Sequence, residues 1–322
     1  MTDASDHPTA LPNAATCTTS PQRHTQLDGL AIMCLIGCCL LWGLNQVAIK
    51  AALPEVPSLV QLSLRSGVAA VLVLGWMRWR GVSFSLNDGT LGPGLLAGVL
   101  FAIEFGCIFV GLKYTTAARS VVFINTSPFV VAIVLAWLTP TERLGKPQMA
   151  GLLLAFTAIV QAFWDGFAHR ELTDSADHHF VGDGLLLLAA VLWGLTTVVI
   201  RTTSLRSAPS EKTLAYQLVV AAVLAPPAAL LAGQGWPQHW STLALSSIFY
   251  QGVIVTFVSY LVWFWLLTRY PATKVQAFVF LSPLFGTASA GWLLAEPIGP
   301  HLLLALVGVV LGLVLMNRRP DA

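Results

Sequence analysis

The chain has 322 residues, of which 56% are hydrophobic and only 10% carry a charged side chain. Soluble proteins have about 25% charged residues, so most of this chain is expected to lie in lipid. A net charge of +2, dispersed along the chain, gives no indication of a nucleic-acid partner. These totals predict an integral membrane protein.

Residues 1–28 are polar and lack the cationic start and short apolar core of a cleaved signal, so we interpret them as a disordered cytoplasmic tail. The remainder contains ten mostly apolar segments near the length of about 20 residues that spans a bilayer. In chain order they are 29–49, 58–78, 91–111, 117–138, 147–165, 182–200, 212–232, 243–267, 272–294 and 300–316.

The basic residues predict the orientation of these segments. With a cytoplasmic N-terminus, 12 Lys and Arg residues fall on the inner side, four fall on the outer side or its border, and Arg65 lies within a helix. Cytoplasmic loops carry an excess of Lys and Arg, so both termini are expected to face the cytoplasm.

The two halves of the sequence resemble each other. Trp42-Gly43 in the first segment returns as Trp193-Gly194 in the sixth, 151 residues later. Five helices per copy is an odd number, so the second copy crosses the membrane in the opposite sense, as in many alternating-access carriers. We therefore predict an all-α protein of two inverted five-helix repeats, residues 29–165 and 182–317, joined by an external linker at 166–181.

Pro128 and Pro283 occupy matching places in the fourth and ninth segments, each 11 residues from the segment start. That is about 16 Å deep, close to the membrane midplane. Proline removes one helical hydrogen bond, which lipid tolerates only where protein or a water-filled cavity satisfies the freed carbonyl. The equal depth favours a helix break at a transport site, with a simple kink as the alternative.

Arg65 and Glu104 each lie seven residues from the outer end of their segments. A charge at the bilayer centre costs at least about 2.5 kcal/mol, so Arg65 is expected to have a partner. Three interpretations stay open. The two residues form a structural ion pair, with Arg119 as another partner for Glu104; or Arg65 binds a substrate carboxylate; or Glu104 carries a coupling proton.

Other polar and aromatic residues are expected beside them. Trp42 and Asn45 are three residues apart and share one helix face. Trp42 and Trp193 lie too deep for an interfacial belt, whereas Trp263 is interpreted as a belt or packing residue. The residues predicted to contact substrate are Trp42, Asn45, Arg65, Glu104, Asn125, Trp193, Thr197, Tyr216, Tyr260 and Gln276.

Glu142 and Glu296 end the fourth and ninth segments at opposite membrane faces, each before a glycine turn. We expect both carboxylates to accept backbone amides at the start of the next helix, a hairpin role. The five cysteines form no C-x-x-C pair, and no spacing brings the histidines of the linker together, so no metal site or cofactor is predicted.

Several short motifs appear in the same order in both halves, except that Arg65 has no counterpart: the aligned position in the second half, 151 residues later, is Tyr216. The motifs are Trp42-Gly43-Leu44-Asn45, Arg65, Tyr114-Thr115-Thr116-Ala117, Pro128 and Glu142-Arg143-Leu144, then Trp193-Gly194, Tyr270-Pro271-Ala272, Pro283 and Glu296. With these motifs the chain resembles the drug/metabolite transporter superfamily, in its EamA-type branch, over about residues 29–317. The resemblance implies a secondary carrier of small metabolites, often an exporter. It also implies a cavity among helices one to four and six to nine, with helices five and ten outside it and free to pack a homodimer.

The predicted function is transport of a small polar metabolite, an amino acid or a related organic anion, across the inner or plasma membrane, in the direction of export. The expected partners are this metabolite and the lipid bilayer. One alternative is efflux of hydrophobic or cationic compounds, with Glu104 as the recognition charge. A channel, or an intramembrane enzyme, is the alternative from another class, although the sequence has no H-E-x-x-H or G-x-S-x-G motif.

Overall fold

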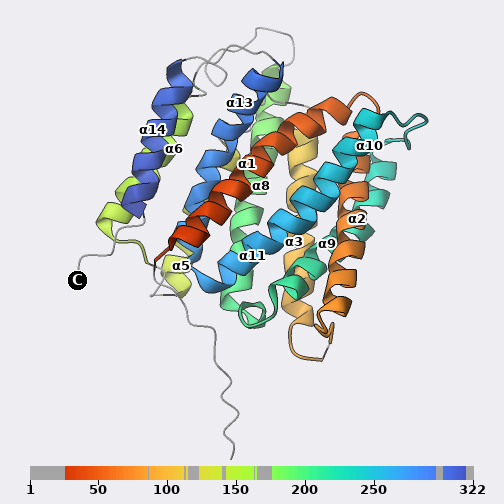
Figure 1. Cartoon of the computed structure of the whole chain (residues 1–322), viewed down its shortest axis with the longest axis horizontal. Coiled ribbons are helices and arrows are strands. Elements are labelled where there is room, and N and C mark those ends of the chain that lie inside the picture. Colours follow the sequence, from red (N-terminus) through yellow and green to blue (C-terminus); the bar gives the residue numbers. More distant parts are fainter. Residues whose placement is uncertain are drawn as a thin grey trace, which may run out of the picture.

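The structure is a computed structural model of the chain, and it describes residues 26–85, 87–111, 114, 123–139, 143–162, 164, 176–294 and 300–316. Within these ranges every regular element is a helix and no strand occurs (Figure 1). This agrees with the predicted all-α class. Glu142 and Glu296 lie outside the described residues, so their expected hairpin role stays a prediction.

The helices follow one another with short connections. The first half contains α1 (Gly29–Ala52), α2 (Ser58–Trp79), α3 (Leu91–Gly111), α5 (Ser127–Leu138) and α6 (Lys146–Ala162). The second half contains α8 (Ala176–Thr202), the 3-10 turn η2 (Ser204–Arg206), α9 (Ser210–Leu231), α10 (Thr242–Phe249), the π-helix η3 (Tyr250–Ser259), α11 (Tyr260–Arg269), α12 (Ala272–Ala277), the 3-10 turn η4 (Phe278–Phe280), α13 (Leu281–Leu294) and α14 (Pro300–Met316).

Six helical stretches of the described chain are long and apolar enough to cross a membrane. They are Gly29–Ile49, Ser58–Trp79, Leu91–Gly111, Phe180–Thr202, Ser210–Leu231 and Thr242–Arg269, with shorter apolar helices at Ser127–Leu138 and Leu304–Met316. The chain is thus a multi-pass membrane protein. The count of ten spans and the direction of crossing stay predictions.

Local signals in the sequence account for several helix ends. The Asp28 carboxylate accepts a hydrogen bond from the backbone amide of Ala31 at 2.8 Å, which caps the start of α1. The Tyr270 hydroxyl donates to the other oxygen of Asp28 at 2.8 Å and ties this end to the α11–α12 connection. Two residues past the end of α2, Gly81 has φ +67°, the left-handed conformation that glycine adopts without strain.

One boundary differs from expectation. The predicted linker at 166–181 overlaps α8, which already begins at Ala176. Three polar residues of the predicted linker, Asp177, His178 and His179, instead occupy the first turn of α8, which extends beyond the apolar stretch. The rest of the predicted linker lies outside the described residues.

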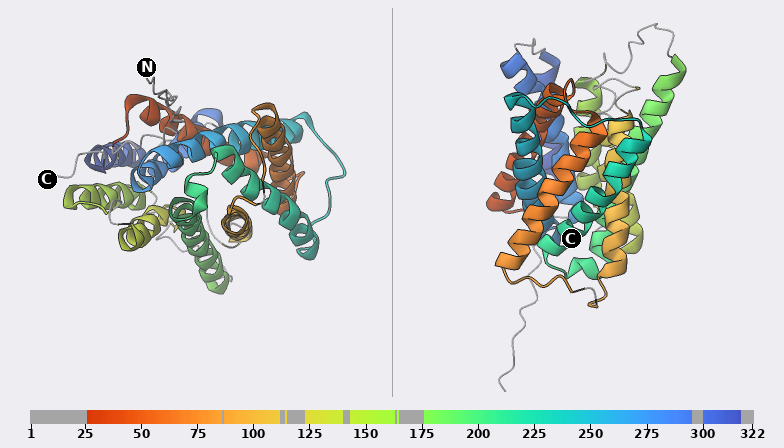
Figure 2. Two further views of the ribbon diagram at one scale, coloured as in Figure 1. Left: turned by 90° about the horizontal axis from the view of Figure 1, so that it is seen from below. Right: turned by 90° about the vertical axis from the view of Figure 1, so that its right-hand side faces the viewer.

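The helices pack in pairs, and the pairs correspond between the halves. In this comparison α1, α2, α3 and α5 of the first half correspond to α8, α9, η3 and α13 of the second. The α1–α13 contact then corresponds to α8–α5, the α3–α8 contact to η3–α1, and the α3–α9 contact to η3–α2. Two further pairs, α2 with α9 and α6 with α14, join equivalent helices of the two halves. These pairs are therefore unchanged when the halves are exchanged. The α6–α14 pair lies at one edge of the bundle (Figures 1 and 2).

Candidate functional site

Arg65 on α2 is only 1% exposed, although it carries a permanent charge. Its guanidinium carbon lies 4.1 Å from the ring centroid of Phe105 and 5.8 Å from that of Phe109, both on α3. These are cation–π distances, and such contacts partly offset the loss of water around the charge. Within the described residues, the Nε and Nη2 atoms of Arg65 have no hydrogen-bond partner. Two donors of the guanidinium are thus buried and unused.

Glu104 precedes Phe105 on α3 and is 3% exposed. The Glu104 carboxylate and the Tyr260 hydroxyl both lie close enough to Arg65 to stabilise its charge electrostatically. Among the described residues, however, Arg65 and Glu104 form no ion pair within 4.0 Å, and Oε2 of Glu104 accepts no hydrogen bond. The two opposite charges are neighbours whose polar atoms are incompletely satisfied.

Aromatic rings surround the first-half tryptophan. The Trp42 ring lies 4.9 Å from Trp263, 5.8 Å from Tyr260 and 6.2 Å from Trp193, all in edge-to-face geometry. This geometry contributes about 0.5–1.5 kcal/mol per pair beyond the buried area. Tyr260 in turn contacts Phe101 at 6.1 Å, and Phe101 contacts Phe105 at 4.7 Å. These rings thus form a continuous series from Trp193 to Phe105, the ring that contacts the Arg65 guanidinium. We call this set the aromatic cluster; its members are Trp42, Phe101, Phe105, Trp193, Tyr260 and Trp263.

A hydrogen bond fixes the orientation of the Trp42 indole. Its Nε1 donates to the Ser259 hydroxyl at 2.8 Å. Ser259 is the last residue of η3, and its own hydroxyl donates to the Val255 carbonyl at 2.6 Å. The Cys38 thiol, one turn before Trp42, donates to the Ser259 carbonyl at 3.6 Å. Two side chains of α1 therefore hold the same residue of η3.

The remaining predicted polar residues are buried nearby or in adjoining helices. Asn45 is 6% exposed, one turn from Trp42, and its Oδ1 has no hydrogen-bond partner within the described residues. Gln276 of α12 donates from Nε2 to the Ser127 hydroxyl of α5 at 3.3 Å. Asn125, two residues before Ser127 in the sequence, is also buried. Thr197, by contrast, donates to the Trp193 carbonyl of its own helix at 3.2 Å.

The two prolines lie in the first turns of helices that follow an irregular stretch. Pro128 is the second residue of α5, after a turn in which the Thr126 hydroxyl donates to the Phe123 carbonyl at 2.7 Å. Pro283 is the third residue of α13, directly after the 3-10 turn η4. Proline costs least in a first turn, because its missing N–H would have no helical acceptor there. The change in helix geometry therefore precedes each proline.

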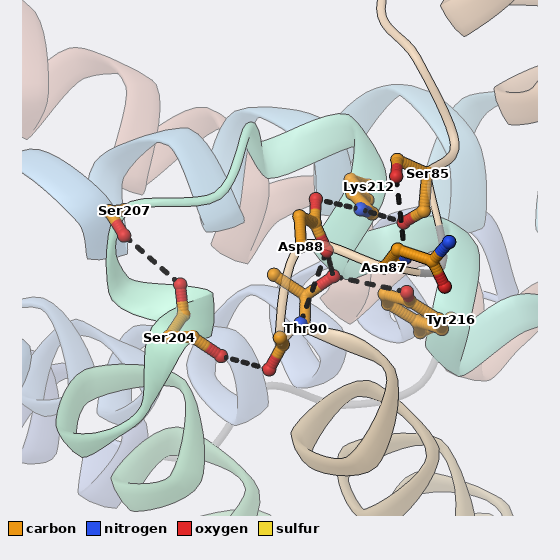
Figure 3. Close-up of polar contacts among 9 residues, drawn as sticks. Ser85, Asn87, Asp88, Thr90, Ser204, Ser207, Lys212 and Tyr216 are labelled. Carbon is orange, nitrogen blue, oxygen red and sulfur yellow. Dashed lines mark hydrogen bonds and ion pairs between the residues drawn. The ribbon is translucent and has the colours of Figure 1, made fainter.

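Tyr216 is the predicted site residue that the structure places elsewhere. Its hydroxyl lies 3.1 Å from the Thr90 hydroxyl (Figure 3). Its ring packs against Phe84, with 4.9 Å between the ring centroids. Both partners belong to the connection between α2 and α3. Alignment of the two halves gives Tyr216 the position equivalent to Arg65, but it could not show that a loop distant in sequence contacts Tyr216.

Tyr216 belongs to a group of polar residues around a buried lysine. The Lys212 ammonium, on a side chain 1% exposed, pairs with the Asp88 carboxylate and donates to the Ser85 carbonyl at 2.6 Å. The Thr90 hydroxyl donates to Asp88 at 2.6 Å. The hydrogen bonds from Lys212 and Thr90 lower the pKa of Asp88 to about 2. We call Ser85, Asp88, Thr90, Lys212 and Tyr216 the lysine cluster (Figure 3).

At the opposite end of α2, a second set of contacts joins the halves through hydrogen bonds to a carboxylate, with no ion pair among the described residues. The Glu55 carboxylate accepts hydrogen bonds from the Ser241 hydroxyl at 2.7 Å and from its amide at 3.0 Å, which lower the pKa of Glu55. Gln234 accepts from the Leu59 amide at 2.9 Å and lies 3.4 Å from the Ser58 hydroxyl. We call Glu55, Ser58, Gln234 and Ser241 the glutamate cluster.

Sequence reasoning missed several members of the site. Trp263, interpreted as a belt or packing residue, is 3% exposed and makes the shortest ring contact of Trp42. Its spacing of three residues from Tyr260 was a usable signal, since residues three apart share a helix face. Ser259 and Phe105 gave no signal, because a small hydroxyl residue and a phenylalanine are ordinary in a spanning helix.

Comparisons with known proteins agree with this architecture. The sequence profile of the EamA-like transporter family matches residues 29–164 and again residues 180–318. An uncharacterized transporter of Archaeoglobus fulgidus is 26% identical over 272 residues, covering 84% of this chain and 91% of that protein. A probable amino-acid metabolite efflux pump of Escherichia coli K12 is 26% identical over 293 residues, covering 89% of this chain and 93% of the pump.

A solved protein structure has the same fold, with a TM-score of 0.74 at 18% sequence identity, over 90% of this chain and 96% of the other. The family match covers most of the chain, and the described helices have the length and apolar character of membrane spans. The chain therefore belongs to the EamA-like transporter family and is a multi-pass membrane transporter, as the sequence motifs predicted.

Proposed function

We propose that this protein is a secondary carrier for a small metabolite with a carboxylate group, an amino acid or a related organic anion, and that Arg65 binds the carboxylate. The observation that carries the proposal is the pair of unused donors, Nε and Nη2, on a guanidinium that is 1% exposed. A buried charge without hydrogen-bond partners raises the free energy of the protein, so a ligand that supplies those hydrogen bonds binds more tightly by removing this cost. The planar fork of arginine matches the two oxygens of a carboxylate.

We further propose that transport proceeds by alternating access between two inverted five-helix repeats, residues 29–165 and 182–317, with both termini cytoplasmic. The family profile matches the chain twice, and the corresponding helix pairs are unchanged when the halves are exchanged. These two facts support the repeat, and the excess of basic residues on one side supports the orientation. The efflux function of related proteins supports export as the direction. A homodimer through α6 and α14 stays a prediction.

Counterflow in proteoliposomes tests the proposal. Liposomes loaded with unlabelled L-alanine should take up labelled L-alanine through the wild-type protein, with saturation. Arg65→Gln should abolish this uptake while the protein inserts normally. Conductance without saturation would instead indicate a channel, and uptake by Arg65→Gln at the wild-type rate would refute the role of Arg65.

Efflux of a cationic compound is the second candidate, because Oε2 of the buried Glu104 also accepts no hydrogen bond within the described residues. In that case Glu104→Gln, and not Arg65→Gln, should abolish transport, and the transported compounds should be amines. The same liposomes distinguish the two candidates when they are loaded with an organic amine in place of L-alanine.

A further inference from the structure

The membrane segment from Thr242 to Arg269 is continuous but not uniform. Its central ten residues, Tyr250–Ser259, form the π-helix η3 between α10 and α11. At its end the Tyr260 amide donates to the Val255 carbonyl, five residues back instead of four. π-helices are rare, mostly single-turn, and frequent at functional sites. A π-helix of this length in the second half, at the edge of the aromatic cluster, therefore calls for a functional explanation.

The equivalent helix of the first half, α3, is an uninterrupted α-helix. Two glycines align the pair. A Cβ atom on Gly98 of α3 would meet Val220 and the Tyr216 carbonyl of α9, and one on Gly252 of η3 would meet Val68 and the Arg65 carbonyl of α2. These glycines are 154 residues apart, whereas Tyr114 and Tyr270, beyond the ends of the same helices, are 156 apart. The second half thus holds two additional residues between them, and the wider turns of η3 accommodate them.

The additional residues change which side chains face α1. Ser259 is the last residue of η3, and its hydroxyl accepts a hydrogen bond from the Trp42 indole at 2.8 Å. Tyr260 and Trp263 pack edge-to-face on the same indole. In an α-helix that lacked the two additional residues, Ser259, Tyr260 and Trp263 would be rotated away from Trp42, since each removed residue turns the helix by about 100°. The π-helix therefore assembles the rings of the second half around the first-half tryptophan.

The assembled rings lie beside Arg65. Tyr260 contacts Phe101, Phe101 contacts Phe105, and Phe105 lies 4.1 Å below the guanidinium. Trp42 and Tyr260 both remain partly exposed, so their faces are not fully used in packing. An unsatisfied cation thus adjoins an aromatic surface, which is the arrangement that recognises a carboxylate carrying an apolar body.

We propose that η3 sets the substrate class of this carrier: the carboxylate binds Arg65, an apolar and preferably planar body packs on Trp42 and Tyr260, and Ser259 is the positioning residue that orients Trp42. This inference rests on the proposed function and narrows it from amino acids in general to those with large apolar side chains. A small polar amino acid would reach Arg65 but leave the aromatic surface uncovered.

The test is competition against counterflow of labelled L-phenylalanine in proteoliposomes, with glycine, L-leucine and L-phenylalanine as probes of equal charge. The wild-type protein should bind L-phenylalanine about tenfold to a hundredfold more tightly than glycine, as expected for burying a large apolar side chain. Ser259→Ala should raise the KM for L-phenylalanine about threefold to tenfold with little change in maximal rate, since one hydrogen bond to the indole is lost. It should leave the inhibition constant of glycine unchanged.

Two further variants separate positioning from folding. Ser259→Thr keeps the hydroxyl and should restore the KM. Ser246→Ala removes an exposed hydroxyl that bonds only to the Leu243 carbonyl of its own helix, and it should behave as wild type.

Equal competition by the three probes would overturn the inference and leave the carrier function standing. A Ser259→Ala protein that loses maximal rate equally for all substrates, without rescue by threonine, would also overturn it, because the role of Ser259 would then be structural. No exchange of any of the three by the wild-type protein would refute the inference together with the proposed function.

Discussion

Arg65 of α2 and Tyr216 of α9 occupy equivalent positions, 151 residues apart, in two helices that pack on each other. Both side chains are buried, but their hydrogen-bond partners differ. Arg65 keeps two donors without partners among the described residues, whereas the Tyr216 hydroxyl lies 3.1 Å from the Thr90 hydroxyl. The first half thus supplies an unsatisfied group beside the aromatic cluster, and the second half uses the same position to hold a loop. Similar folds of the two halves carry different chemistry.

The two ends of α2 extend the comparison. The lysine cluster joins the α2–α3 connection to α9 through an ion pair, and the glutamate cluster joins the α1–α2 connection to the segment before α10 through neutral donors. Each cluster contacts a loop of one half and a helix start or loop of the other. One end therefore depends on a buried charge, and the other does not.

The largest effect is expected at the equivalent pair itself. Arg65→Ala should reduce transport at least about thirtyfold, because the substrate carboxylate would lose its charged, hydrogen-bonding partner, a loss of about 2–5 kcal/mol. Tyr216→Phe should leave transport near the wild-type rate and lower the free energy of unfolding by about 1 kcal/mol, the value of one hydrogen bond. Counterflow rates and thermal unfolding in detergent measure the two effects. A Tyr216→Phe protein as inactive as Arg65→Ala would show that the positions are not functionally different.

The Trp-Gly motif gives the next comparison. A Cβ on Gly43 of α1 would lie 2.5 Å from the backbone nitrogen of Gly286, whereas one on Gly194 of α8 would lie 2.7 Å from the Val130 side chain. A side chain can move aside more easily than backbone, so Gly43→Ala should destabilise the protein more than Gly194→Ala. The expected loss for Gly43→Ala is about 1–3 kcal/mol or more in the free energy of unfolding. Gly37→Ala is the matched control on α1, because nothing lies within 4 Å of its added Cβ. Equal stability of the Gly43 and Gly37 variants would contradict the packing described here.

The two clusters should also respond differently to loss of a partner. Lys212→Met removes the buried charge and its hydrogen bonds together, which should cost about 1 kcal/mol. Asp88→Ala should destabilise more, because it leaves the buried ammonium with only the Ser85 carbonyl. Glu55→Gln in the glutamate cluster keeps an oxygen acceptor for Ser241 and leaves the cap of α10 intact, so it should have the smallest effect. Chemical or thermal unfolding of the three variants ranks them, and a Lys212→Met protein less stable than Asp88→Ala would reverse the argument.

The smallest expected effect is on the pH dependence of stability. The pKa of Asp88 falls from 3.8 to about 2 on folding, so its pairing stabilises the protein fully above about pH 4 and is lost as the pH falls towards 2. The pKa of Glu55 is lowered too, and its contribution is lost in the same direction. The unfolding temperature of the wild type should therefore drop more between pH 5 and pH 3 than that of Asp88→Asn. Parallel curves for the two proteins would rule out this linkage.

Much of the fold was predictable because lipid imposes simple requirements. Long apolar segments have to be helices, so the spans that include Arg65, Glu104 and Trp42 could be placed from composition alone. Equal depth on consecutive helices predicted that Arg65 and Glu104 are neighbours; Glu104 lies close enough to act electrostatically on Arg65, although the two form no ion pair within 4.0 Å. The repeated Trp-Gly motif indicated which helices correspond, and Trp42 and Trp193 are in ring contact.

The remaining features depend on information that a single sequence does not carry. Residues 250–259 are at least as apolar as the α-helices α2 and α9, so nothing in their composition distinguishes the π-helix η3. Tyr216 was predicted as a site residue because it aligns with Arg65, and its loop partners, Phe84 and Thr90, are more than a hundred residues away in the sequence. The irregular turn before Pro128 was not visible either, since proline predicts a disturbance without fixing on which side it occurs.

The α6–α14 pair has a consequence for how the protein is made. A Cβ on Gly151 of α6 would lie 2.5 Å from the Gly312 carbonyl, and one on Gly312 of α14 would lie 2.6 Å from the Gly151 carbonyl, so the two backbones touch directly. Small residues allow such close approach between membrane helices. Because α6 is synthesised before α14, its glycine face has no partner helix until α14 has also been made. This edge of the bundle can therefore assemble only after α14 has been synthesised.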